Sequence, residues 1–243
     1  MKVALSPRDR DNTMVDRKST WNPGRFLETL AFFEACGYFN PVVKGLQRMI
    51  KGSSLPGPGP FSPGEGPNLF DFRQPSDEQI ACWAALDDVV MGGVSQSQLV
   101  LTEGMARFSG VVSTDNSGGF ASIRTRNFEP PLNLSVVQGL VLELRGDGQR
   151  YKFFLRDSPG WDAIAYGYSF DTTPGEWLSV SIPFSQLTPV FRAKRQPQAP
   201  ALNPATICSF QLMLSKFEYD KQLNPHFRAG SFCLDMATIR TFS

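Results

Sequence analysis

The sequence predicts a mainly β protein, with an antiparallel sandwich or barrel over residues 68–243 and a helical region before it. Two observations carry this prediction. From residue 68 onward, apolar side chains alternate with polar ones in short runs, as expected of strands with one buried face. Turn signals separate the runs, namely Gly146-Asp147-Gly148, Ser158-Pro159-Gly160 and Thr173-Pro174-Gly175-Glu176.

The strands are expected where aromatic and aliphatic residues occupy every second position. These runs are Phe108 to Val112, Leu140 to Leu144, Tyr151 to Leu155, Ile164 to Phe170, Cys208 to Leu214 and Phe232 to Met236. Many short strands at this spacing are typical of β-sandwiches and barrels. No amphipathic stretch of helix length interrupts residues 68–243.

The first 67 residues predict a different structure. Asn22-Pro23 and Asn40-Pro41 each place an N-cap residue before a proline at the first helical position. We therefore expect a hairpin of two helices, at about 23–36 and about 41–51. A stretch almost entirely of Gly, Pro and Ser follows and predicts a linker. The expected organisation is 1–51 as a tail plus helical hairpin, 52–67 as the linker and 68–243 as the sandwich.

Two roles are open for the hairpin. Its first arm carries Phe26, Phe32 and Phe33, and two arms cannot bury all of this aromatic surface against each other. The hairpin either docks on the sandwich or contacts a partner. An anionic membrane surface is one such partner, because residues 1–51 carry nine Lys or Arg against five Asp or Glu.

Composition limits the classes of function. The net charge of +1 gives no reason to expect nucleic acid as a partner. No apolar run has the length of a membrane span, and the N-terminus lacks the apolar core of a signal peptide. The cysteines form no Cys-x-x-Cys motif, which predicts reduced thiols. Reduced thiols indicate the cytoplasm or a stroma- or matrix-like compartment. A location peripheral to a membrane remains an open alternative. The cysteines are Cys36, Cys82, Cys208 and Cys233.

The stretch from Trp83 to Thr125 holds the most distinctive residues of the chain. They are Trp83, Asp88, Met91, Gly92, Gly93, Ser95, Gly118, Gly119 and Phe120. Further motifs follow in order: Gly146-Asp147-Gly148 with Tyr151-Lys152, Trp177 with Ile182-Pro183-Phe184, and Gly230-Ser231-Phe232. Over roughly residues 70–242, this series resembles the signature of the complex I intermediate-associated protein family.

The resemblance implies a galactose-binding-like β-sandwich of jelly-roll type. It also implies a chaperone-like assembly factor that binds subunits or intermediates of a membrane-bound electron-transfer complex. That complex is respiratory complex I or a related photosynthetic complex of thylakoids. The same fold hosts carbohydrate-binding modules, so a saccharide-binding module is the alternative. Residues 1–67 lie outside the resemblance.

The residues themselves give no indication of an enzyme. The chain has a single histidine, His226, and no dinucleotide-binding fingerprint. No serine has an evident partner base. We therefore predict no catalytic residue and no cofactor.

Adjacent carboxylates invite comparison with catalytic or metal sites. In a strand, Asp87 and Asp88 face opposite ways and cannot form an acid–base pair. In a turn, one of them can cap the N–H groups of the glycine turn. The alternative is a calcium site built from Asp71, Asp87, Asp88 and Asp235, although no D-x-D-x-D spacing supports it. Gly92-Gly93 predicts a tight turn rather than a phosphate loop, because strand-like residues follow it.

The best candidate for a ligand or partner face lies farther along the chain. Lys152, Phe154 and Arg156 share one face of a predicted strand. Arg124 and Arg126 share a face of another strand.

Aromatic residues follow this strand at Trp161, Tyr166 and Tyr168. Together with the basic residues they suggest an aromatic and cationic groove for a saccharide or a peptide. Exposed charges beside core aromatics are the plainer interpretation. The proline-rich loop 190–204 carries Arg192, Lys194 and Arg195 and is either solvated or a contact for a partner.

Overall fold

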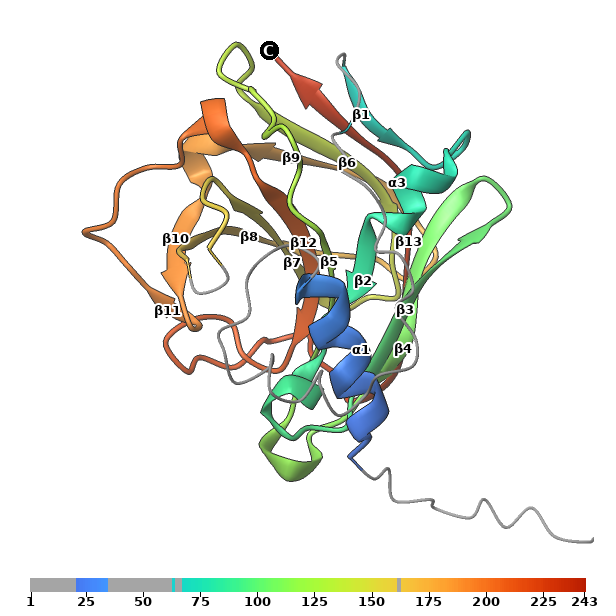
Figure 1. Cartoon of the computed structure of the whole chain (residues 1–243). Helices are drawn as coiled ribbons and strands as arrows, with labels where there is room; N and C mark the ends of the chain where they lie inside the picture. The colour runs from blue at the N-terminus through green and yellow to red at the C-terminus, as the bar shows by residue number, and fades with distance from the viewer. Residues whose placement is uncertain (1–20, 35–62, 64–66, 161–162) are drawn as a thin grey trace, which may run out of the picture.

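The computed structural model describes residues 21–34, 63, 67–160 and 163–243 (Figure 1). The second predicted helix, about 41–51, and nearly all of the predicted linker lie outside these residues. Among the described helices, none is long and apolar enough to cross a membrane.

The elements follow the predicted order of helix first and strands after. The helices are α1 (Pro23–Glu34) and α3 (Asp77–Ala81), with 3-10 turns η1 (Asp88–Met91), η2 (Asp115–Ser117), η3 (Phe184–Gln186) and η4 (Pro204–Thr206). The strands are β1 (Asn68–Asp71), β2 (Trp83–Ala85), β3 (Gln96–Thr102), β4 (Met105–Val112), β5 (Phe120–Thr125), β6 (Gly139–Arg145), β7 (Arg150–Arg156), β8 (Ala165–Asp171), β9 (Trp177–Pro183), β10 (Thr188–Phe191), β11 (Lys194–Arg195), β12 (Ser209–Ser215) and β13 (Gly230–Phe242).

Two antiparallel sheets form the predicted sandwich. In the described part of the chain, one sheet has the order β3-β4-β13-β6-β9, with β1 paired to β13 as a sixth strand. The other has seven strands in the order β11-β10-β8-β7-β12-β5-β2. Neighbours in a sheet are often far apart in the sequence, as β5 and β12 are, so the fold depends on long-range pairing.

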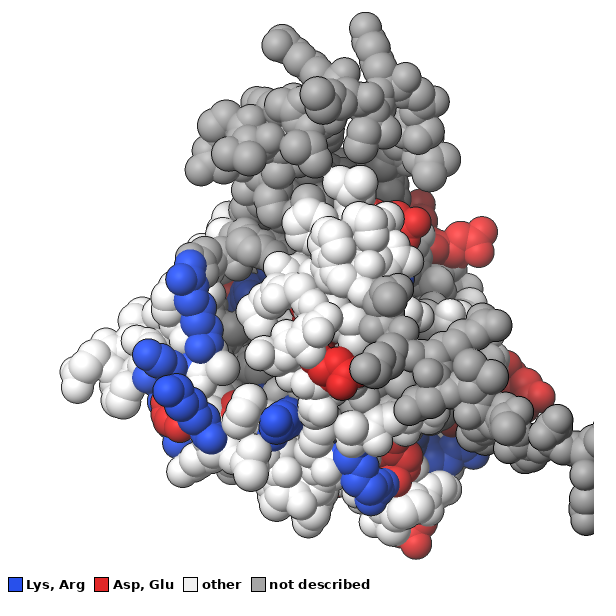
Figure 2. Space-filling model, turned by 90° about the horizontal axis from the view of Figure 1, so that it is seen from below, with Lys and Arg blue, Asp and Glu red and all other residues white. Residues whose placement is uncertain are grey.

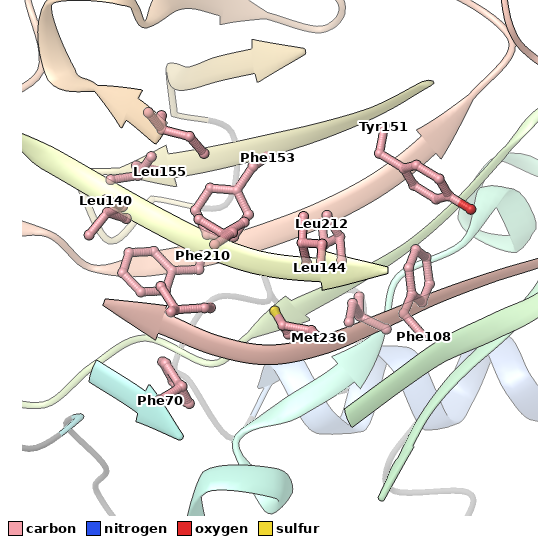
Figure 3. Close-up of a cluster of buried hydrophobic side chains, with 14 of the residues drawn as sticks. Phe70, Phe108, Leu140, Leu144, Tyr151, Phe153, Leu155, Phe210, Leu212 and Met236 are labelled. Carbon is pink, nitrogen blue, oxygen red and sulfur yellow. The ribbon is translucent and has the colours of Figure 1, made fainter. Parts of the chain in front are cut away.

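The core lies between the sheets and confirms the predicted alternation (Figure 3). Phe210 of β12 packs against Phe153 of β7, with ring centroids 5.4 Å apart, and against Phe128, at 5.1 Å. Each predicted run contributes its apolar positions to the same core. Fully buried members include Phe108, Leu140, Leu142, Leu144, Tyr151, Phe153, Leu155, Phe210, Leu212, Leu214 and Met236.

Helix α1 begins as its sequence predicts. The Asn22 side chain accepts hydrogen bonds from the backbone N–H groups of Gly24 (2.9 Å) and Arg25 (3.2 Å), and Pro23 occupies the first helical position. This is an N-cap, which satisfies donors that a helix start otherwise leaves without acceptors.

The same helix docks on the sandwich (Figure 1), which was one of its two expected roles. The Trp21 indole N–H donates to the carbonyl of Val89 over 3.1 Å. The Arg25 guanidinium lies 3.1 Å from a carboxylate oxygen of Asp87 and also donates to the carbonyls of Ser95 and Ser97. Because Asp87 is buried, this contact supplies a cation to a carboxylate that water does not reach.

Replacing Arg25 by methionine is expected to lower the free energy of unfolding by about 1–3 kcal/mol, because the buried Asp87 carboxylate loses its cation. Chemical denaturation of the full chain measures this loss. Glu28→Met is the matched control, since Glu28 is exposed on the same helix. Equal stability of the two variants would mean that α1 does not hold the sandwich through Arg25.

Candidate functional site

Asp88 binds several backbone groups of the stretch from Trp83 to Thr125, which we call the glycine-rich stretch. Its buried carboxylate accepts hydrogen bonds from the backbone N–H (2.9 Å) and the hydroxyl (2.7 Å) of Ser95. It also accepts from the backbone N–H groups of Gly119 (2.7 Å) and Phe120 (3.2 Å). Asp88 therefore caps backbone N–H groups as predicted, but its donors are Ser95, Gly119 and Phe120 rather than Gly92 and Gly93, and they come from two separate segments.

The neighbouring Asp87 is also buried and accepts hydrogen bonds, but from different residues. Its carboxylate accepts from the backbone N–H of Ser97 (2.8 Å), from the Ser97 hydroxyl, and from the backbone N–H of Ser122 (3.0 Å). Burial raises the pKa of Asp87, while the hydrogen bonds from Ser97 and Ser122 and the charge of Arg25 oppose that rise. Ser97 lies in β3, an edge strand of one sheet, and Ser122 lies in β5, next to the edge strand β2 of the other, so Asp87 joins the two sheets.

Two glycines of the stretch make room for the Asp88 carboxylate. A Cβ atom on Gly93 would lie 2.3 Å from Cγ of Asp88, and one on Gly118 would lie 2.5 Å from an Asp88 carboxylate oxygen. Gly92 ends η1 with φ = 88°, a left-handed conformation that favours glycine. Gly92-Gly93 is therefore the tight turn that the sequence predicts, and β3 follows it.

The four aspartates proposed as weak calcium ligands are not brought together. Asp71 accepts from Arg73 (2.8 Å), and Asp235 accepts from Arg107 (2.7 Å) and Arg145 (2.7 Å). Burial opposes ionisation of Asp235, but the hydrogen bonds from Arg107 and Arg145 prevail and lower its pKa. Among the described residues, no group of three or more His, Cys, Asp or Glu side chains is arranged to hold a metal ion.

Gly93→Ala is expected to destabilise the protein by about 2–3 kcal/mol, because four hydrogen bonds prevent Asp88 from moving away from the new methyl group. Thermal or chemical unfolding measures the effect. Gly160→Ala is the control, since a Cβ there would meet Ala163 at 3.4 Å, an ordinary contact. If Gly93→Ala unfolds like Gly160→Ala, Asp88 does not fix this turn.

The predicted basic residues lie on the face of the seven-stranded sheet that points away from the other sheet, where Arg124, Arg126 and Lys152 are nevertheless buried. Arg124 of β5 and Phe154 of β7 lie on either side of Gln211 of β12, and Arg156 lies beside Ser209. Their neighbours along each strand point into the core, so these side chains point away from it. We call Arg124, Arg126, Arg156, Ser209 and Gln211 the cationic face; Arg126 follows β5 with the parity of Arg124.

Arg156 is the distinctive member of the cationic face. Its Nε and Nη1 atoms are buried and have no hydrogen-bond partner, and the same holds for the hydroxyl oxygen of Ser209, its cross-strand neighbour. Burial and the nearby charge of Arg124 lower the pKa of Arg156. A guanidinium nevertheless stays protonated in proteins, so Arg156 holds a positive charge whose buried Nε–H and Nη1–H groups have no acceptor. A carboxylate or phosphate would satisfy them.

Lys152 and Phe154 are on the expected face, but another segment covers them. The Lys152 ammonium donates to the carbonyls of Phe217 and Glu218 and lies 5.1 Å from the ring centre of Tyr219. Phe154 packs in a small second cluster with Tyr219, Ala165 and Val190. Burial lowers the pKa of Lys152 to about 8, although Glu218 acts to raise it. Lys152 thus holds a loop in place rather than facing a ligand.

Tyr166 and Tyr168 do not join the cationic face. Strand β8 pairs with β7 so that Tyr166 is opposite Leu155 and Tyr168 is opposite Phe153, and both tyrosines pack against the main core. The predicted groove of aromatic and basic side chains is therefore corrected on this side, where the tyrosines lie on the opposite face of the sheet. Trp161 lies outside the described residues.

A hollow lies on the outer face of the six-stranded sheet, where sequence reasoning placed no site. It has a volume of about 300 Å³ and is lined by Arg73, Glu143, Trp177, Ala237, Thr238 and Arg240. The Trp177 side chain is 46% exposed, and the Arg145 guanidinium lies 5.2 Å from its ring centre. Glu143 accepts from Arg240 over 3.3 Å. A sequence pattern that could have indicated this hollow is the alternation in β6, where Leu142 and Leu144 are buried and Glu143 and Arg145 therefore point outward.

No disulfide joins the three described cysteines. Cys82 and Cys208 are buried, Cys233 is half-buried, and all three are free. Burial raises the pKa of each thiol, so none is activated as a nucleophile. Cys36 lies outside the described residues.

Comparison with known proteins identifies the family. The family model of complex I intermediate-associated protein 30 matches residues 70–236. An uncharacterized protein of Schizosaccharomyces pombe is 31% identical over 165 residues, which cover 61% of this chain and 75% of the relative. The chain therefore belongs to the complex I intermediate-associated protein 30 family, as its motifs predict.

Solved structures share the fold. A family 11 carbohydrate-binding module from Clostridium thermocellum is similar with a TM-score of 0.50 and 17% identity, over 73% of this chain and 95% of the module. The family 11 module of a cellulosomal cellulase from that organism gives 0.48 and 16%, over 78% and 97%. The first similarity, with the two antiparallel sheets, shows the predicted galactose-binding-like β-sandwich.

Proposed function

We propose that this protein is a non-enzymatic assembly factor that binds a subunit or an intermediate of a membrane-bound electron-transfer complex, respiratory or photosynthetic. We further propose that an acidic segment of that partner docks on the cationic face. Family membership supports the role in assembly. The observation that carries the mode of binding is Arg156, whose buried Nε and Nη1 have no acceptor.

The energetics of Arg156 favour binding over a purely structural role. A buried charge without a counterion costs free energy that the rest of the fold must offset. A partner carboxylate between Arg124 and Arg156 would supply the missing counterion and acceptors. Guanidinium–carboxylate hydrogen bonds are short and strong in a site shielded from water, so they would favour the bound state.

Features of a hydrolase or oxidoreductase do not converge in the described residues. The His226 ring bonds to Asp171 over 2.7 Å, and Asp171 also pairs with Arg150. No hydroxyl or thiol is among the described hydrogen-bond partners of this ring. A function in binding thus fits the geometry better than a nucleophilic mechanism does.

Arg156→Gln tests the proposal with two readouts. We expect tagged Arg156→Gln, isolated from its native cell, to lose the co-purifying subunits of the complex that the wild type retains. We also expect unfolding to show it at least as stable as the wild type, because the variant removes a desolvated charge. Arg228→Gln, which removes an exposed cation elsewhere, is the control.

Two outcomes would contradict the proposal. Co-purification that survives Arg156→Gln would place the partner elsewhere on the molecule. Loss of stability together with loss of subunits would make Arg156 a structural residue.

A saccharide is a second candidate ligand, supported by the Trp177 hollow. An exposed indole beside Glu143, Arg73 and Arg240 offers a stacking surface with hydrogen-bonding groups at its edge, and the Thr238 hydroxyl there is buried without a partner. The family 11 module was solved with a β-1,3-1,4-mixed-linked tetrasaccharide, which makes that sugar a suitable probe.

Calorimetry with this tetrasaccharide tests the second candidate. Binding by the wild type, at least tenfold weaker in Trp177→Ala because stacking is lost, would support it. Val136→Ala, at an exposed position outside the hollow, is the control and should bind like the wild type. If neither this tetrasaccharide nor a panel of neutral oligosaccharides gives a measurable heat of binding, a saccharide is not the ligand of the hollow.

A further inference from the structure

Two tight turns meet at one edge of the seven-stranded sheet. The first joins β10 to β11, where Arg192 and Ala193 have φ of 47° and 59°. The second closes the bridge between Phe217 and Leu223, where Asp220 and Lys221 have φ of 56° and 66°. Both turns have two successive left-handed residues, as in the tightest hairpins. We call residues 190–195 and 216–223 together the double tip.

The double tip is held as one unit. The backbone N–H of Asp220 donates to the carbonyl of Ala193 over 2.9 Å, and the Asp220 carboxylate accepts from the backbone (3.0 Å) and the guanidinium (2.9 Å) of Arg195. Beneath it, the Lys152 ammonium binds the carbonyls of Phe217 and Glu218. A surface on the double tip is therefore fixed in shape.

Positive charge dominates the double tip, although the whole chain is nearly neutral. It carries five basic residues: Arg192, Lys194, Arg195, Lys216 and Lys221. Its two acids are engaged, because Asp220 pairs with Arg195 and Glu218 pairs with Arg150. Figure 2 shows Lys and Arg side chains gathered along the side of the molecule where β10 and β11 lie.

Apolar side chains are exposed among these charges. Leu223 is 65% exposed and Phe217 is 40% exposed, and the Lys216 ammonium lies 5.5 Å from the centre of the Phe217 ring. The two residues face each other across the bridge that closes the second turn. Cations around a small apolar protrusion match the surface of an anionic bilayer, in which phosphates lie above the acyl chains.

We propose that the double tip docks the protein on an anionic membrane surface, with Lys194 and Lys221 facing lipid phosphates and Phe217 and Leu223 entering the interface. This docking does not depend on a protein partner at the cationic face. The sequence suggested a membrane contact through residues 23–51, but the described part of that region, α1, packs on the sandwich. The contact proposed here lies on the sandwich itself.

Sedimentation of the full chain with vesicles tests the proposal. We expect binding to vesicles of phosphatidylcholine with phosphatidylserine, little binding to phosphatidylcholine alone, and weakening as salt increases. The double variant Lys194→Gln/Lys221→Gln should lower the partition coefficient about thirtyfold, since each cation near such a surface contributes roughly 1 kcal/mol. Leu223→Ser should weaken the binding that remains at high salt.

Matched controls separate the double tip from overall charge. Arg73→Gln/Arg228→Gln removes two exposed cations elsewhere and should bind vesicles like the wild type. Equal loss in both double variants would overturn the proposal, and so would equal binding to neutral vesicles. Full competition by soluble glycerophosphoserine would indicate a site for a free phosphate compound instead. Unchanged vesicle binding by Lys194→Gln/Lys221→Gln with loss of co-purifying subunits would assign the double tip to an acidic protein.

Discussion

The burial of two adjacent carboxylates is the constraint on which much of this sandwich depends. An ionised carboxylate without partners costs several kcal/mol in a protein interior. Asp88 receives four hydrogen bonds from residues of the glycine-rich stretch, and Asp87 receives four from β3, β5 and α1. These donors fix where β3 of one sheet and β5 of the other lie relative to each other. Gly93 and Gly118 have no side chain because the Asp88 carboxylate occupies that space.

Much of the fold was predictable because strand alternation is a local property. The apolar positions of β6, β7 and β12 repeat every second residue, and the structure buries those positions. The cap of α1 was also local, since Asn22 and Pro23 need only the next turn of helix. The strand order was not predictable from composition or alternation, because β5 pairs with β2 and β12, the second more than 80 residues away.

The candidate site was predicted only in part, for the same reason. Parity alone correctly placed Lys152, Phe154 and Arg156 on one face of their strand. Parity cannot say which face of the next strand is buried, so Tyr166 and Tyr168 were assigned to the wrong side until the register of β8 against β7 was known. The cover over Lys152 comes from Tyr219 and its neighbours, which follow it by more than 60 residues. Such contacts have no local signal.

Lys152 connects the two surfaces inferred for this molecule. Its strand, β7, carries Arg156 on the same face, and its ammonium holds the backbone of Phe217 and Glu218 beneath the double tip. Burial lowers the pKa of this lysine, which means that keeping the charged ammonium at this position lowers the stability of the fold. A rigid link of this kind fixes the angle between the cationic face and the double tip. If one surface holds a protein partner and the other a membrane, that fixed geometry restricts binding to segments presented near the bilayer, and each weak contact raises the effective concentration for the other.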